Sequence, residues 1–262
     1  MTLVQMCKLI LMTENIFNIF LTIWVLIGLG TFVYLFKITA PYGRHETSGW
    51  GIQVPARIGW IVMESPSVIL MFGLGWIMRY ELETIHETFL MIWLIHYIHR
   101  TFIYPFWMDM TTKTMPIIIP VSAFGFNIIN VLVQAIGIYY FTEYSGNWYE
   151  TSMFKIGLIV FVVGMFINIY SDYSILKMKK EKGAGYHIPQ GLFHKSVSSP
   201  NYLGEIIEWL GWAILTWSIS GLVFFIWTVA NLFPRAIANH KWYQDKFENY
   251  PKDRKAIIPG VI

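Results

Sequence analysis

The sequence predicts an all-α fold, a polytopic membrane bundle of about seven transmembrane helices with the N-terminus outside and the C-terminus in the cytoplasm. Three observations carry this prediction: a composition that is 55% hydrophobic and only 13% charged, several long apolar segments, and basic residues on alternate loops. A soluble domain usually has about a quarter charged residues. We therefore expect residues 1–262 to form one integral membrane domain.

The helices are predicted from apolar windows of about 18–25 residues, which is the length that crosses a bilayer. Only "SIS" separates the last two windows, so we expect the sixth helix to be short. The first window lacks the basic start and cleavage site of a signal peptide, so we expect it to be retained. The predicted spans lie near 16–36, 58–78, 87–104, 117–141, 153–172, 202–217 and 220–239.

Basic residues indicate the orientation, because Lys and Arg concentrate on cytoplasmic loops. With the N-terminus outside, the cytoplasmic pieces hold all of the 19 Lys and Arg residues except Lys8, Arg79 and Lys155. The loops "RYELETIHE" and "TEYSGNWYE" on the opposite side are acidic. This asymmetry predicts an odd number of spans. The expected cytoplasmic pieces are 37–57, 99–116, 173–201 and 235–262.

Several classes of function are not expected. A net charge of +3 is too small to suggest nucleic acid, and a single Cys7 excludes an internal disulfide. His96 and His99 lie three residues apart without an HExxH pattern, so we predict no metal site. The segment "EKGAGYHIPQGLF" lacks GxGxxG spacing, so any nucleotide would bind between helices. No obligate protein partner is evident, and the apolar spans predict contact with membrane lipid.

Ionisable and amide side chains occur inside several predicted spans, where charge is expensive and therefore suggests function. Asn201, Glu205 and Glu208 lie at i, i+4 and i+7, which places them on one face of a helix. Nearly all of these residues lie toward the cytoplasmic ends of their helices, which predicts one polar chamber open to the cytoplasm. The set comprises Glu64, His96, Tyr97, His99, Arg100, Asn168, Asp172, Asn201, Glu205, Glu208, Arg235, Asn239, His240 and Tyr243.

Most of these residues also have a structural explanation. Glu205 and Glu208 lie in the first turns of a helix, where the positive end of the dipole favours carboxylates. Asp172 could form an ion pair with Lys177 or Arg100 that fixes the topology. Four cytoplasmic lysines either follow the positive-inside rule and touch anionic lipid or hold phosphates of a ligand. These lysines are Lys177, Lys179, Lys180 and Lys182.

The aromatic and imidazole groups have alternatives of the same kind. His96 and His99 could be interhelical hydrogen-bond partners, and Tyr97 could belong to an interfacial aromatic belt. Glu64 has the weakest structural explanation, because it lies inside the otherwise apolar segment "GWIVMESPSVIL". Pro66 follows it and loosens the helical backbone ladder, which suits the lining of a cavity.

Several motifs together resemble the membrane steroid 5α-reductases, the 3-oxo-5α-steroid 4-dehydrogenases. The similarity extends from about Tyr42 to the C-terminus, and "NYLGEIIEW" with the tail "YPKDRKAIIP" is its most specific part. The other segments that carry it are "IHYIHRTFIY", "INIYSDY", "YHIPQGLF" and "ILTW".

The resemblance implies a seven-helix enzyme that uses NADPH to reduce the carbon–carbon double bond of a 3-oxo-Δ4 steroid. Hydride would add to the β-carbon of the enone and a proton to the α-carbon. The polar cofactor would enter from the basic cytoplasmic side, and the steroid would enter sideways from the bilayer. The expected membrane is a bacterial inner membrane or the endoplasmic reticulum, with the active site facing the cytoplasm.

The resemblance also implies roles for individual residues. Glu64 and Tyr97 would contact the steroid carbonyl, and Trp209 would line the steroid slot. The chain departs from the family at Lys179, where an Arg is usual, and in 107–116, which lacks the family's Asn and Arg residues. The implied cofactor-binding residues are Tyr42, Arg44, Arg100, Asn168, Asp172, Lys179, Tyr186, His187, Asn201, Glu205, Arg235, Asn239 and Tyr243.

This chemistry suits the residue types. Conjugate reduction places negative charge on the carbonyl oxygen, which a preorganised donor stabilises. The Tyr97 hydroxyl is the natural donor, and Glu64 either orients it or donates a proton itself.

The alternative functions are a reductase of another sterol or enoyl lipid double bond and an isoprenylcysteine-type methyltransferase that uses S-adenosylmethionine. A transporter would need a polar path across the whole membrane, whereas these polar groups cluster on one side.

Overall fold

A computed structural model describes residues 14–47, 49–108, 110–183 and 185–262, so Cys7 and Lys8 lie outside the described residues. Within these ranges, seven helices of 15 residues or more form a bundle, which confirms the all-α prediction. Five of them, α2, α3, α6, α7 and α9, are long and apolar enough to cross a membrane. The helices are α2 (Glu14–Lys37), α3 (Ala56–Met78), α4 (Thr84–Ile98), α6 (Ile118–Tyr140), α7 (Ser152–Lys182), α8 (Pro200–Thr216) and α9 (Ile219–Lys246).

The predicted span 87–104 is not one regular helix. α4 continues into a π-helical turn, His99–Ile103, and then into the short helix α5, Tyr104–Trp107. A π-helical turn rotates the following side chains relative to a regular helix and frequently marks a functional site. Here it carries Arg100, one of the residues predicted to bind a cofactor.

Two helices extend further than predicted at the end expected to be cytoplasmic. α7 continues ten residues beyond position 172 to Lys182, and α9 continues from 239 to Lys246. Lysine is the commonest residue of these extensions; it forms helices well and favours the negative end of the helix dipole. α7 stops at Gly183, whose φ of 82° few other residues adopt. An apolar window cannot detect a helix that continues through polar residues.

The small elements lie between the long helices. Strands β1 (Gln53–Pro55) and β2 (Thr114–Pro116) pair in antiparallel register, with Val54 opposite Met115. Three 3-10 turns were not predicted either. These are Gly43–His45, Trp148–Glu150 and Phe193–Lys195.

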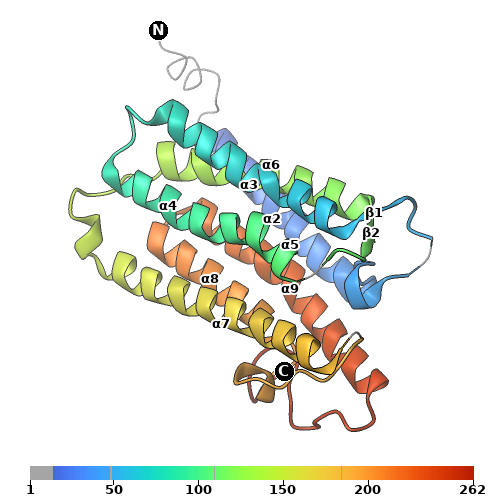
Figure 1. The fold of residues 1–262 in the computed structure, drawn as a ribbon. Coiled ribbons are helices and arrows are strands. Elements are labelled where there is room, and N and C mark those ends of the chain that lie inside the picture. The colour runs from blue at the N-terminus through green and yellow to red at the C-terminus, as the bar shows by residue number, and fades with distance from the viewer. Residues whose placement is uncertain (1–13, 48, 109, 184) are drawn as a thin grey trace.

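Successive long helices run in alternating directions (Figure 1). The β1–β2 pair, the C-terminal ends of α7 and α9 and the C-terminal tail gather at one end of the bundle, opposite the start of α2 (Figure 1). This arrangement agrees with an odd number of crossings. The assignment of that end to the cytoplasm stays a prediction, as does the single-domain assignment.

Glycines bring α7 and α8 into backbone contact. A Cβ atom on Gly164 would collide with the backbone of Glu208, and one on Gly204 would collide with the backbone of Asn168. Gly157 and Gly211 repeat the pattern one heptad away, against the backbones of Leu215 and Phe161. Small residues allow helices to approach this closely in a membrane, where dispersion contacts replace the hydrophobic effect between helices.

The C-terminal tail fixes the start of α8. Val197 and Lys255 form a parallel bridge, and the backbone amide of Ser198 donates to the Lys255 carbonyl at 2.8 Å. The buried Arg254 donates from Nη1 to the Pro189 carbonyl at 3.3 Å. The tail therefore holds the loop that precedes α8.

We expect Gly164→Val to separate α7 from α8 and to destabilise the protein by about 1–3 kcal/mol, the usual cost of overpacking. Thermal unfolding in detergent measures this change. Gly125→Val is the matched control, because a Cβ atom at Gly125 on α6 meets nothing within 4 Å. An equal effect of both substitutions would contradict the backbone contact.

Candidate functional site

One large cavity of about 720 Å³ opens among the helices, and all seven long helices contribute to its lining. Ligand cavities in proteins typically measure about 300–1,000 Å³. Three sequence-predicted substrate residues, Glu64, Tyr97 and Trp209, line it. So do ten of the predicted cofactor residues: Tyr42, Arg44, Arg100, Asp172, Lys179, Tyr186, Asn201, Glu205, Arg235 and Asn239.

Three other predicted cofactor residues are not part of the lining. Asn168 lies directly behind it, and its Nδ2 donates to the Asn201 carbonyl at 2.9 Å. Tyr243 is buried under Arg44, whose guanidinium carbon lies 4.5 Å from the centre of the tyrosine ring. His187 lies in the loop after α7, where its Nε2 is 3.4 Å from the Gly183 carbonyl.

Glu64 and Tyr97 line the same cavity from adjacent helices, α3 and α4. Asn127 of α6 donates from Nδ2 to a Glu64 carboxylate oxygen at 3.3 Å and to the Met63 carbonyl at 2.7 Å. Tyr97 packs against two indoles, with ring centres 4.7 Å from Trp93 and 5.7 Å from Trp209. Polar hydroxyl and carboxyl groups thus border an aromatic wall.

The start of α8 meets the middle of α7 in a network of amide and carboxylate groups. Asn201 donates from Nδ2 to Asp172 Oδ1 at 3.0 Å, and Asn168 donates to Glu205 Oε2 at 3.3 Å. The second Asp172 oxygen is buried without a hydrogen-bond partner among the described residues. A buried carboxylate oxygen in this condition is a place where a ligand donor would be stabilised.

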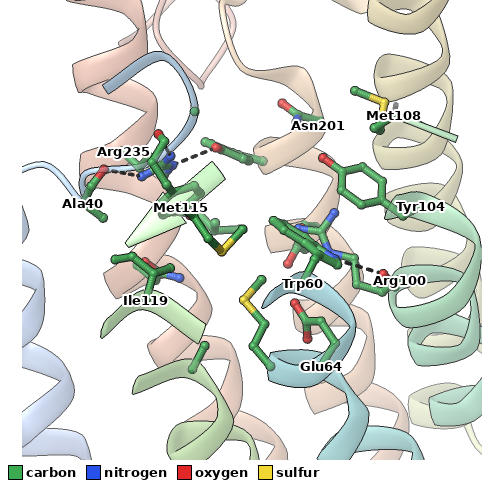
Figure 2. A pocket seen from close by; sticks show the side chains of 18 of the residues that line it. Ala40, Trp60, Glu64, Arg100, Tyr104, Met108, Met115, Ile119, Asn201 and Arg235 are labelled. Carbon is green, nitrogen blue, oxygen red and sulfur yellow. Dashed lines mark hydrogen bonds and ion pairs between the residues drawn. The ribbon is translucent and has the colours of Figure 1, made fainter. Parts of the chain in front are cut away.

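Arg100 links this network to α3. Its guanidinium forms an ion pair with Glu205 at 3.6 Å and lies over the rings of Trp60 and Tyr104 at 4.7 and 4.5 Å. Trp60 donates from Nε1 to the Arg100 carbonyl at 3.0 Å. Figure 2 shows Trp60, Arg100 and Tyr104 on one side of the cavity and Arg235 across from them. The π-helical turn therefore aims Arg100 at the carboxylate of α8.

The guanidinium of Arg235 donates its hydrogen bonds to other groups of the protein. It donates to the Tyr202 hydroxyl at 3.0 Å and to the carbonyls of Ala40 and Tyr42 at 3.3 and 3.2 Å. Its guanidinium also lies 3.6 Å from the centre of the Tyr42 ring. Burial raises the pKa of Tyr42, so its hydroxyl stays protonated. Arg235 thus holds the segment after α2 over the cavity.

Three cations face the same part of the cavity, Arg44, Lys113 and Lys179. Among the described residues, no carboxylate forms an ion pair with any of them. Arg44 Nη1 is buried without a hydrogen-bond partner in the described chain. Unneutralised cations in one opening favour an anionic ligand, and phosphate oxygens suit them best.

A hydrogen-bonded chain connects the 3-10 turn Gly43–His45 to the start of α8. Asn239 Oδ1 is 2.9 Å from His45 Nε2, and its Nδ2 donates to the Ser199 hydroxyl at 3.2 Å. Burial lowers the pKa of His45, so the ring is neutral at pH 7 and Nε2–H donates to the amide oxygen. Asn239 therefore ties two rims of the cavity together.

His96 and Glu208 form a buried couple beside the cavity. His96 Nδ1 is 2.7 Å from Glu208 Oε1, and the two residues are 6% and 0% exposed. The interhelical hydrogen bond expected as an alternative for His96 is thus present. The ion pairs considered for Asp172 are not: Lys177 pairs with Glu181 at 3.9 Å, and Arg100 pairs with Glu205.

Several residues that line the cavity were not predicted from the sequence. Tyr104 follows Arg100 by one helical turn, and Lys113 is the lone cation of the segment 107–116, so both carried a signal. Trp60, Asn127 and Tyr202 gave none, because an aromatic or amide side chain in a span is common and its direction depends on packing. All five line the cavity.

Comparison with known proteins decides the family. Residues 113–262 match the family model described as 3-oxo-5-alpha-steroid 4-dehydrogenase. The chain belongs to this family. It is 45% identical to steroid 5-alpha-reductase DET2 of Arabidopsis thaliana, over 95% of this chain and 97% of the relative.

Animal relatives match over nearly the same length. The chain is 38% identical to 3-oxo-5-alpha-steroid 4-dehydrogenase 2 of Mus musculus, over 89% of this chain and 92% of the relative. It is 35% identical to 3-oxo-5-alpha-steroid 4-dehydrogenase 1 of Bos taurus, over 90% and 93%. Family membership and the apolar helices make the chain a membrane-embedded oxidoreductase, for which a nicotinamide cofactor is the plausible electron donor.

We expect Asn239→Ala to release the segment around His45, because it removes both hydrogen bonds that tie the two rims. Hydrogen exchange of the amides in 40–47 should become faster, while exchange in α6 stays unchanged. Gln244→Ala is the control, since Gln244 lies on the exposed side of α9. Equal exchange in both variants would show that the link is not structural.

Proposed function

We propose that this protein uses NADPH to reduce the carbon–carbon double bond of a 3-oxo-Δ4 steroid to the 5α-dihydro steroid. The observation that carries the proposal is one continuous cavity that joins an aromatic region at Glu64 and Tyr97 to a cationic opening at Arg44 and Lys179. An apolar substrate and an anionic cofactor can meet in such a cavity. The names of the steroid-reducing relatives support the substrate class.

The residues present fit a dinucleotide. The nicotinamide carboxamide needs both donors and acceptors, and Asn201 and Glu205 supply them beside the unpartnered oxygen of Asp172. The phosphates need cations, and Arg44, Lys113 and Lys179 supply these at the opening. When bound, NADPH supplies the hydride.

Glu64 and Tyr97 polarise the substrate carbonyl in this proposal. Reduction develops negative charge on the carbonyl oxygen, and a donor that is already in place stabilises that charge in a water-poor cavity. The Tyr97 ring is buried and packs against Trp93 and Trp209, which fixes the residue in place. Asn127 fixes the Glu64 carboxyl, which either orients the tyrosine or donates a proton itself.

The aromatic residues define where the steroid lies. Trp24, Phe126, Phe224 and Trp227 line the cavity from α2, α6 and α9, and Trp209 lies 4.3 Å from Phe224 between ring centres. Flat aromatic faces suit a flat fused-ring substrate. We infer that the steroid enters from the surrounding lipid, because its free energy is lowest there. The cofactor enters from the cationic end.

The decisive experiment incubates the purified protein with NADPH and progesterone or testosterone and identifies the product. A 5α-dihydro steroid supports the proposal. Reduction of an enoyl thioester instead would place the enzyme among other lipid reductases. Stabilisation by S-adenosylmethionine but not by NADPH would overturn the redox assignment.

We expect Glu64→Gln and Tyr97→Phe each to lower kcat by about 10²–10³-fold, the usual effect of losing a group that stabilises an oxyanion. NADPH affinity, measured by titration calorimetry, should change little. Ser65→Ala is the control, because the Ser65 hydroxyl bonds to the Val62 carbonyl and does not line the cavity. Near-normal turnover of either variant would remove that residue from catalysis.

We expect Lys113→Gln to raise KM for NADPH about 10-fold and KM for NADH less, because Lys113 is one of the three cations proposed to hold the phosphates and NADPH carries one phosphate more. A hydrogen bond to a charged group is worth about 1.5–3 kcal/mol. Lys177→Gln is the matched control, because Lys177 is exposed and pairs with Glu181. An equal loss for both cofactors would assign Lys113 to the shared diphosphate.

A further inference from the structure

We propose that His96, held by Glu208, is the acid that delivers the proton to the substrate α-carbon. This inference rests on the proposed steroid reduction, which consumes one proton as well as one hydride. Glu64 and Tyr97 account for the carbonyl oxygen, but neither role supplies the hydrogen that the α-carbon gains. His96 lines the same cavity as Tyr97.

The location of the couple supports this role. The His96 ring lies edge-on to Tyr97 at 4.9 Å and to Trp209 at 4.7 Å between ring centres. The α-carbon of an enone is two bonds from its carbonyl oxygen, so an oxygen near Tyr97 brings that carbon near His96. Nδ1 is occupied by Glu208, which leaves Nε2 as the nitrogen that can act in the cavity.

The balance of charge requires a proton on the couple. Glu208 is completely buried, and its second oxygen has no hydrogen-bond partner among the described residues. An isolated carboxylate in that position would be very costly. Arg100 is already paired with Glu205, so the charge of Glu208 is offset by a proton shared with His96. The couple therefore stores one acidic proton beside the substrate.

Charged and titratable groups on the elements packed around His96 also affect protonation of its imidazole ring. Burial and Arg100 oppose the imidazolium, whereas the carboxylates of Glu64, Glu205 and Glu208 favour it. Opposite charges within a few ångströms favour the charged form of a group, and like charges disfavour it. The groups are Glu205 and Glu208 on α8, Glu64 on α3, and Arg100 and His99 in the turn after α4.

In the proposed reaction, proton transfer follows hydride transfer. Hydride addition to the β-carbon leaves an enolate, whose negative charge rests on the oxygen beside Tyr97 and Glu64. The enolate electron pair forms the new bond between the α-carbon and the proton of His96 Nε2. The Nε2–H bond breaks with its electrons left on nitrogen, and Nδ1–H remains bonded to Glu208. Water from the open end of the cavity then protonates Nε2 again.

The test compares His96→Gln with His99→Gln; His96 lies near the end of α4, and His99 begins the π-helical turn that follows. His99 packs edge-on against Trp107 at 5.9 Å and does not line the cavity. We expect His96→Gln to lower kcat by about 10²-fold, the usual contribution of a general acid. KM for NADPH should stay within about threefold of the wild type.

The pH dependence of kcat distinguishes a role of His96 in proton transfer from a role in packing alone. In the wild type, kcat should fall as rising pH removes the imidazolium proton, and His96→Gln should lack this fall. If His96→Gln retains the fall, or turns over within about threefold of His99→Gln, the proposal is wrong. Failure of the wild type to reduce any steroid would instead refute the proposed function on which the inference rests.

Glu208→Gln keeps the test available if His96→Gln does not fold. A neutral amide still accepts the Nδ1 hydrogen bond but no longer stabilises the imidazolium. We expect about a 10-fold loss of kcat that is largest at the alkaline end of the profile. Unchanged kcat across the profile would overturn the role of the couple.

Discussion

The backbone contact between α7 and α8 is the constraint on which the site depends. Gly164 and Gly204 remove the Cβ atoms that would separate the two helices. Asn168 can then reach both Asn201 and Glu205 with one short amide side chain. With alanine at either glycine, the helices would move apart and these hydrogen bonds would lengthen beyond a useful distance. The close contact between α7 and α8 therefore determines the positions of the polar groups of the site as well as the packing of the helices.

The same constraint explains why the cavity carries charge on one side and aromatic rings on the other. α7 and α8 position the carboxylate and amide groups. Arg100, in the π-helical turn, forms an ion pair with Glu205 at 3.6 Å. Trp209 and Phe224 line the remaining wall, and Trp93 packs against both of them. Charged groups that already have partners allow an apolar ligand to lie beside them without an unpaired charge.

The sequence predicts this architecture well where one physical signal dominates. Apolar length gave the seven helices, and the Asn201, Glu205 and Glu208 spacing gave the polar face of α8. It predicts less well where packing decides direction. Glu205 and Glu208 lie less than one turn apart, yet Glu205 pairs with Arg100 and lines the cavity, while Glu208 is buried against His96. No helical spacing rule distinguishes two such partners.

The complete burial of Glu208 requires an explanation, because α8 already carries one carboxylate, Glu205, inside the bundle. A packed apolar residue at that position would usually be neutral or favourable for stability, because desolvating an ion pair costs several kcal/mol. The couple of Glu208 with His96 lies on a helix whose backbone contacts α7 at Glu208 itself. A stabilising role does not account for this cost, whereas the proton transfer that we propose for the couple does.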